Sequence, residues 1–190
     1  MSEFIDKIIY INLEKRKDRK IEIEDELSKF DLLSNAERFN AIENDTGIVG
    51  CTESHLNVLK LAKERGYKNI LILEDDFTFL LSKEEFEKNL KLFFDSKINY
   101  DVLMLSYNLI RSKPVVKFPF VGKVIEAQTA SGYIVNHKYY NKLINLYEYT
   151  LPLLKSTGMH WEYANDQCWK IFQPEDNWYY FTNRIGKQRP

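Results

Sequence analysis

The sequence predicts an α/β fold with a mainly parallel central sheet flanked by helices. Short apolar runs, KIIYINL at residues 7–13 and ILIL at residues 70–73, read as buried strands. Segments with helical spacing of apolar residues separate these runs, and strand–helix alternation is typical of parallel sheets. A chain of 190 residues with only 7 Gly and 5 Pro indicates a folded globule. We expect one domain that spans residues 1–190.

Two helices are predicted in the first half of the chain. Residues 15–30 are rich in charge and carry apolar side chains at helical spacing, namely Ile23, Leu27 and Phe30. Residues 52–65 place Leu56, Leu59 and Ala62 on one side, and Gly66 follows as a helix stop.

The second half continues the alternation. Ser82 and Glu85 have the spacing of a capping box, which predicts a helix over residues 83–94. Further strands are predicted at residues 101–105 and, as one or two strands, at 124–135. Further helical segments are predicted at residues 138–149 and 163–172.

Composition excludes several classes of function. The 27 basic and 28 acidic residues nearly cancel, so no global field attracts nucleic acid or an anionic membrane. No apolar stretch approaches the roughly 20 residues of a transmembrane helix, and the first residues lack the layout of a signal peptide. Cys51 and Cys168 form no metal or redox spacing. We therefore expect a cytoplasmic protein with two reduced thiols.

Three consecutive carboxylates, Glu74, Asp75 and Asp76, directly follow the apolar run at residues 70–73. Parallel sheets bind ligands at the carboxyl ends of their strands. Two unit charges 4 Å apart repel by about 4 kcal/mol at an effective dielectric constant near 20, so the triplet needs compensation. One possibility is that the acids turn into solvent and cap a turn. The other is a hard cation, Mg²⁺ or Mn²⁺, which also binds substrate phosphates.

Six sequence blocks, in this order, resemble glycosyltransferase family 25, which contains lipooligosaccharide galactosyltransferases and relatives of the procollagen galactosyltransferases. The blocks are IIYINLEKRKDRK (8–20), ERFNAIEN (37–44), GCTESHLNVLKLA (50–62), ILILEDD (70–76), TASGYIVNHKYYNKLI (129–144) and WEYANDQCW (161–169). The resemblance implies a GT-A type, Rossmann-like fold, a nucleotide-sugar donor and an inverting, metal-assisted transfer. Family members usually continue beyond the closing NRIGKQRP, so it also implies a C-terminally short domain.

Five residues are candidates for binding the donor beside the acids. Asn12 ends the first strand, where its amide either contacts a base or ribose edge or belongs to a turn. Arg16 and Arg19 are one helical turn apart and either present two guanidiniums to a phosphate or uracil or form a solvated basic face. For Arg19 the resemblance favours donor binding. Ser54 and His55 begin a predicted helix, where anions are favoured, although His55 is equally suited to a structural role.

The carboxylates are assigned different roles in the candidate site. Asp76 is the expected direct ligand of Mn²⁺ or Mg²⁺, Glu74 orients the metal group, and Asp75 contacts the ribose of the donor or the metal. His160 is a candidate to complete the metal shell late in the chain. For the general base, which typically contributes about 10²–10⁴-fold, Asp166 is the candidate and Glu162 the reserve.

These observations predict a hexosyltransferase. It would move galactose or glucose from a UDP-sugar to a hydroxyl of a glycan or a glycosylated protein. One alternative is a nucleotidyltransferase-like enzyme, which normally has a glycine-rich phosphate loop, whereas EKRKDRK follows the first strand here. The other alternative is a non-catalytic nucleotide-sugar-binding module of the same fold.

Overall fold

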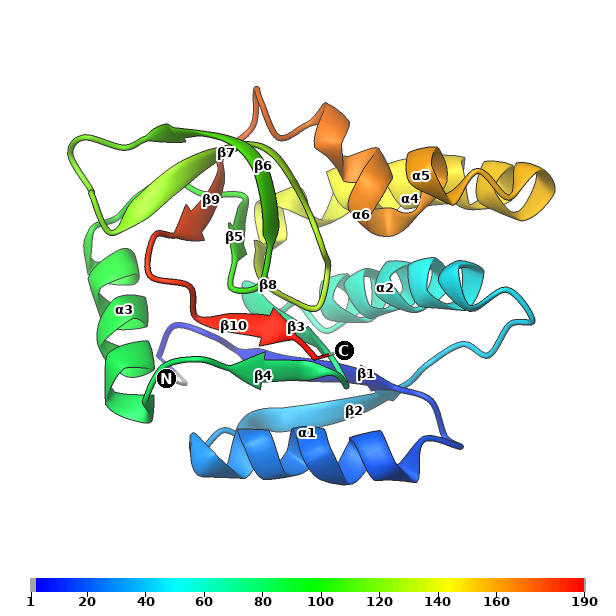
Figure 1. Ribbon diagram of the computed structural model, residues 1–190, viewed down its shortest axis with the longest axis horizontal. Helices are drawn as coiled ribbons and strands as arrows, with labels where there is room; N and C mark the ends of the chain where they lie inside the picture. The colour runs from blue at the N-terminus through cyan, green and yellow to red at the C-terminus, as the bar shows by residue number, and fades with distance from the viewer. Residues whose placement is uncertain (1–2, 190) are drawn as a thin grey trace.

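The computed structural model describes residues 3–189 and contains an eight-stranded central sheet in the order β2-β1-β3-β8-β5-β9-β7-β6 (Figure 1). Its strands are β1 (Lys7–Asn12), β2 (Ala36–Asn40), β3 (Asn69–Glu74), β5 (Val102–Met104), β6 (Asn108–Pro114), β7 (Val121–Gln128), β8 (Gly132–Asn136) and β9 (Trp178–Phe181). A second sheet pairs β4 (Phe77–Phe79) with β10 (Gly186–Gln188). The helices are α1 (Lys17–Lys29), α2 (Gly47–Glu64), α3 (Lys83–Asp95), α4 (Tyr140–Thr157), α5 (His160–Tyr163) and α6 (Asn165–Cys168), with short 3-10 helices at Leu33–Asn35, His137–Tyr139 and Trp169–Ile171.

The expected α/β fold with flanking helices is confirmed, but the sheet is mixed instead of mainly parallel. β1 pairs in parallel with β2 and β3, and β5 pairs in parallel with β9. The predicted strand region at 124–135 forms two strands, and β8 runs antiparallel between β3 and β5. β7 pairs antiparallel with β6 and β9. The parallel expectation fails in the second half because β5, β6, β7 and β8 follow one another through short connections instead of helical crossovers.

The predicted helices are present, with shifted ends. The capping box before α3 is formed, since Glu85 N–H donates to Ser82 Oγ and Ser82 N–H donates to Glu85 Oε2. α4 continues beyond residue 149, where the predicted helix ends, and is capped by Gly158. The φ of Gly158 is 69°, the left-handed conformation that glycine favours. α2 starts at Gly47, five residues before the predicted Thr52, and this shift changes the interpretation of the site.

Two apolar cores cover the two faces of the sheet. Ile70 and Ile72 of β3 pack in the core that contains residues of α2 and α4. Leu71 and Leu73 pack in the opposite core, with residues of α1 and α3. Because successive strand side chains point to opposite faces, Glu74 falls on the same face as Ile72, towards α2. In the described part of the chain, none of the helices is long and apolar enough to cross a membrane.

β10 brings residues 186–189 beside the acidic triplet. It pairs antiparallel with β4, which follows the triplet directly, and Figure 1 draws the two strands side by side. A Cβ at Gly186 would lie 2.2 Å from the Phe77 ring, so the close approach of β10 requires a glycine at this position.

Candidate functional site

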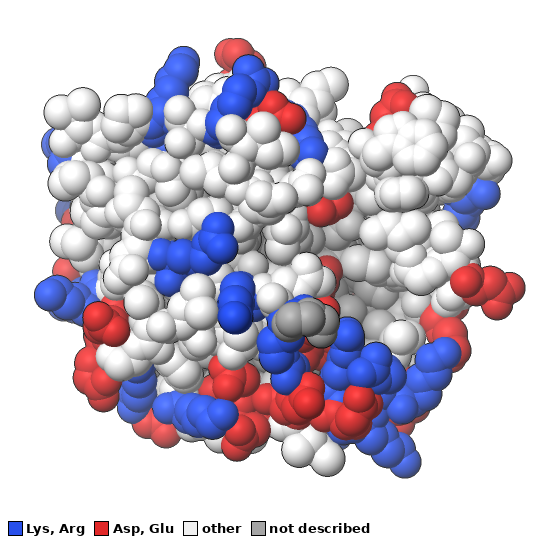
Figure 2. Space-filling model, viewed as in Figure 1, with Lys and Arg blue, Asp and Glu red and all other residues white. Residues whose placement is uncertain are grey.

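The three acids span the end of β3 and the turn into β4, as expected for a ligand site at a strand end. A pocket of about 350 Å³ opens at this point. It is lined by the acids, by the segment that joins β1 to α1, by the segment that joins β2 to α2, and by the first turns of α2. Figure 2 shows this face hollowed on its right-hand side, with acidic and basic side chains interleaved along the lower edge.

Asp76 is buried, and only one of its two carboxylate oxygens has a hydrogen-bond partner among the described residues. Its Oδ2 accepts hydrogen bonds from Gln188 Nε2 at 3.1 Å and from Arg19 Nη1 at 3.4 Å. Its Oδ1 is buried and has no hydrogen-bond partner among residues 3–189. Burial, and then the negative charge of Glu74, raise the pKa of Asp76 to about 6. A buried acceptor without a donor is costly, and a cation would satisfy it.

Asp75 is held by the residues predicted to bind the donor. Asn12 Nδ2 donates to Asp75 Oδ2 at 2.8 Å, and Arg19 Nη1 donates to Asp75 Oδ1 at 3.2 Å. The Asn12 amide also donates to the Arg16 carbonyl, and its Oδ1 accepts from Arg38 Nε at 3.0 Å. Asn12 is 1% exposed, so its amide orients Asp75 in this structure and is not free to contact a base or ribose.

The two predicted arginines do not face one anion. Arg16 lines the pocket, but its guanidinium pairs with Asp18 at 2.7 Å. Arg19 also lines the pocket and lies against Asp75 and Asp76. Of these two arginines, Arg19 is therefore the one whose charge lies at the acidic turn.

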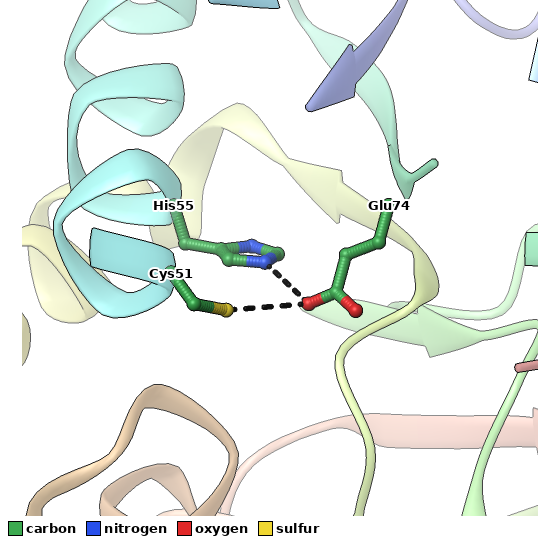
Figure 3. Close-up of side chains that lie close together, drawn as sticks. All are labelled: Cys51, His55 and Glu74. Atoms are coloured by element: carbon green, nitrogen blue, oxygen red, sulfur yellow. Dashed lines mark hydrogen bonds and ion pairs between the residues drawn. The ribbon is translucent and has the colours of Figure 1, made fainter. Parts of the chain in front are cut away.

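The side chain of Glu74 points towards α2 and not towards the turn that contains Asp75 and Asp76. Its Oε1 accepts hydrogen bonds from His55 Nε2 at 3.0 Å and from Cys51 Sγ at 3.5 Å (Figure 3). His55 Nδ1 lies 2.8 Å from the hydroxyl of Tyr133. Burial opposes ionisation of Glu74, but the hydrogen bonds from His55 and Cys51 outweigh it and lower the pKa of Glu74. These contacts fit the orienting role expected of Glu74.

The interpretation of Ser54 and His55 as residues of a helix start is wrong. Because α2 begins at Gly47, both lie inside the helix, fully buried, and their backbone N–H groups are not helix-terminal. Ser54 Oγ accepts from Ile42 N–H at 2.8 Å and donates to the Gly50 carbonyl at 2.7 Å. Ser54 therefore fixes the pocket segment around Ile42. Gly47, at the observed start of α2, lines the pocket, and Ser54 lines it as well.

Among the described residues, no hydrogen bond or ion pair joins His160, Glu162 or Asp166 to the acidic turn. Asp166 Oδ2 accepts a hydrogen bond from Thr129 N–H at 3.0 Å, between β7 and β8. His160 and Glu162 are exposed on α5, and the His160 ring packs against Trp161 with centroids 5.1 Å apart. No hydrogen bond or ion pair between described residues joins His160 to Asp76. The metal-ligand role of His160 stays a prediction without a supporting contact.

Sequence reasoning missed Gln188 and Arg189. In addition to the Gln188–Asp76 bond, Arg189 N–H donates to the Asp76 carbonyl at 2.8 Å and Arg189 Nη2 donates to the Asp75 carbonyl at 2.7 Å. Arg189 Nη1 also pairs with Glu22 of α1 at 2.6 Å. No local pattern in the sequence signals these contacts, because the partners lie more than 100 positions apart.

The family model of glycosyltransferase family 25 (LPS biosynthesis protein) matches residues 46–160, more than half of the chain. The chain belongs to glycosyltransferase family 25. Membership makes the protein an enzyme of the transferase class, with a sugar donor and an acceptor as its substrates. The matched region contains the whole of α2 and the acidic triplet.

Solved structures support the fold of this family 25 domain. A glycosyltransferase involved in the glycosylation of the major capsid of PBCV-1 superposes with a TM-score of 0.54 at 9% identity, covering 96% of this chain and 91% of that chain. A mannose-1-phosphate geranyltransferase from Thermus thermophilus gives a TM-score of 0.53 at 10% identity, covering 94% and 73%. The expected GT-A type fold is confirmed by these similarities. A search of curated proteins gives no match.

Proposed function

We propose that this family 25 transferase moves a hexose, galactose or glucose, from a UDP-sugar to a hydroxyl of a glycan or of a glycosylated protein. The transfer inverts the sugar carbon and uses Mn²⁺ or Mg²⁺. The observation that carries the proposal is the buried Oδ1 of Asp76, which has no hydrogen-bond partner in the described part of the chain and lies at a pocket of about 350 Å³. That volume lies within the roughly 300–1,000 Å³ of small-molecule sites.

The residues at the turn suit a hard divalent cation. Such ions prefer carboxylate oxygens, and Asp76 supplies one that no described donor occupies. Asp76 would be the direct ligand, with Asp75 beside it and Glu74 held in place by α2. When bound, the ion supplies positive charge that neutralises the diphosphate leaving group.

Positive groups of the protein surround the same pocket. Lys15, Arg16 and Arg19 line it, together with the N-terminus of α2 at Gly47. A helix N-terminus and basic side chains favour anions, and Arg presents paired donors to phosphate. We assign the diphosphate of the donor to this side of the acidic turn.

Asp166 is our candidate base, which takes the proton of the acceptor hydroxyl as its oxygen attacks the sugar carbon. The Asp166 carboxylate is partly buried, and its Oδ2 accepts a hydrogen bond from Thr129 N–H at 3.0 Å, which holds it in place. Glu162 stays the reserve.

Titration calorimetry with UDP, with and without Mn²⁺, tests the proposal on Asp76→Asn. The variant is expected to lose Mn²⁺-dependent UDP binding while its circular dichroism is unchanged. Asp45→Asn removes the same charge from another part of the pocket wall and should keep the binding. Unchanged affinity in Asp76→Asn would exclude the turn as the metal site. Donor hydrolysis across a panel of nucleotide-sugars then identifies the donor.

A further inference from the structure

We propose that Cys51, His55 and Glu74 form a second cation site, selective for Zn²⁺-like ions and separate from the hard-cation site at Asp76. Their ligand atoms, Sγ, Nε2 and a carboxylate oxygen, all lie within 4.8 Å of one another. Figure 3 shows both α2 side chains pointing at the same oxygen of Glu74. The site shares only Glu74 with the proposed donor-metal site, where Glu74 has an orienting role and Asp76 is the direct ligand.

Two of the distances between these atoms are close to the edges of a small coordination tetrahedron, and the third, from Cys51 Sγ to His55 Nε2, is within 4.8 Å. Zn²⁺ binds nitrogen and oxygen at about 2.0–2.1 Å and sulfur at about 2.3 Å, so adjacent ligand atoms lie roughly 3.3–3.6 Å apart. Cys51 Sγ and Glu74 Oε1 are 3.5 Å apart, and His55 Nε2 and the same oxygen are 3.0 Å apart. The second edge has to open by a few tenths of an ångström, which a rotation of one side chain supplies.

The fold holds the three ligands in place. Cys51 and His55 are four residues apart on α2 and therefore share one face of the helix. Glu74 reaches them from β3 because its side chain falls on the α2 face of the sheet. The Tyr133 hydroxyl, 2.8 Å from His55 Nδ1, fixes the ring from behind. Metal-bound histidines typically donate the N–H of their second ring nitrogen to a hydrogen-bond acceptor, and the Tyr133 hydroxyl can accept it.

The protons balance on binding. In the cation-free state two hydrogens, one on His55 Nε2 and one on Cys51 Sγ, point at Glu74 Oε1. Binding replaces both: the thiol proton leaves to solvent, and the imidazole proton moves to Nδ1, where it faces the Tyr133 hydroxyl. A divalent cation with one thiolate, one carboxylate and a neutral imidazole has no net charge, which suits a buried site.

Access and ligand type separate this site from the acidic turn. Cys51 and Glu74 line the pocket at the acidic turn, which gives an ion a route to the site. Thiolate and imidazole favour Zn²⁺ or Co²⁺, whereas the carboxylate of Asp76 favours Mn²⁺ or Mg²⁺. The other cysteine, Cys168, contacts Thr150 and the Asn165 carbonyl, so it is a matched control.

Cobalt titration of the reduced, chelator-treated protein tests the proposal. We expect one equivalent of Co²⁺ to give thiolate-to-cobalt charge-transfer absorption and tetrahedral ligand-field bands, both removed by added Zn²⁺. Cys51→Ala is a small change inside α2 and should abolish the absorption. His55→Gln should weaken Co²⁺ binding at least tenfold. Cys168→Ala and Asp76→Asn should keep the absorption.

The controls also separate this proposal from the proposed transfer. The second site would be overturned if the wild-type protein gave no cobalt absorption. It would also be overturned if the absorption survived in Cys51→Ala or disappeared in Cys168→Ala. Loss of Mn²⁺-dependent UDP binding in Asp76→Asn, with cobalt absorption intact, would leave each site supported by its own measurement.

Discussion

The Nη1 atom of Arg19 lies 3.2 Å from Oδ1 of Asp75, 56 positions later in the sequence. The same nitrogen lies 3.4 Å from Asp76 Oδ2, so one guanidinium bridges two of the three acids. A positive group is thus already present at the acidic turn. It competes with a cation for the carboxylates and is well placed to attract a diphosphate.

Arg19→Ala is expected to have opposite effects on the metal and on the nucleotide. Mn²⁺ alone should bind about fivefold more tightly, about 1 kcal/mol, because a competing ion pair is removed. UDP in the presence of Mn²⁺ should bind more weakly by about 1.5–3 kcal/mol, the range for hydrogen bonds to charged groups. Both are measured by calorimetry.

Arg16→Ala is the matched comparison, since Arg16 lines the same pocket but pairs with Asp18. It should leave the affinity for Mn²⁺ alone unchanged. A change in UDP affinity below about 0.5 kcal/mol in Arg19→Ala, as for most surface substitutions, would limit Arg19 to a structural ion pair.

Gln188→Ala removes the side-chain hydrogen bond that β10 gives to Asp76 Oδ2. We expect Mn²⁺-dependent UDP binding to weaken by about 1 kcal/mol, the size of one hydrogen bond, because the carboxylate is no longer oriented. Lys187→Ala, on the exposed side of the same strand, should have no effect on the titration. Equal affinities in the two variants would mean that β10 does not orient the acid.

Asp166→Asn tests the base. Its initial rate at saturating donor should fall by about 10²-fold or more. UDP affinity should stay within a factor of about 3, because a base acts in the transition state and the metal acids hold the donor. The amide oxygen can still accept from Thr129 N–H, so the fold should persist. Retained turnover would move the role to Glu162, and lost UDP affinity would place Asp166 in the donor shell.

Glu26 is expected to make stability depend on pH. Burial alone would raise its pKa, but hydrogen bonds from Lys29, from the Thr78 hydroxyl and from Phe79 N–H lower it. Because the folded pKa is below the unfolded value of about 4.3, its stabilisation is complete above that pH and is lost as the pH falls through the folded pKa.

Glu26→Gln should therefore lower the free energy of unfolding at pH 7 by about 1.5 kcal/mol, the weak end for bonds to a charged group. The difference from wild type should shrink when urea denaturation is repeated below pH ~4. Asp25→Asn, which removes an exposed ion pair to the same Lys29, should cost less than about 1 kcal/mol. A difference that does not change with pH would contradict the role of Glu26.

The place of the acidic triplet in the fold is predictable from sequence, but its partners are not. Asp76 is expected at a strand end, and it lies there with one carboxylate oxygen that accepts no hydrogen bond from a described residue. His55 was expected to bind an anion from a helix start, but it is buried inside α2 against Glu74. That error came from the start of α2, because GIVG at residues 47–50 gives no apolar period and no capping side chain.

The sequence by itself determined the alternation of strands and helices, the capping box before α3 and the acidic triplet at a strand end. These features depend on residues within a few positions of each other, and local periodicity records them. The order of the blocks also identified the family.

Only the tertiary structure decided which side chains meet at the triplet. Asn12, Arg19 and Gln188 reach the acids from 56 to 112 positions away. β8 inserts antiparallel between β3 and β5, which no period along the chain specifies. Such contacts arise because strands pair and pack through burial of their apolar faces. Polar residues at the strand ends are then brought together although they lie far apart in the sequence.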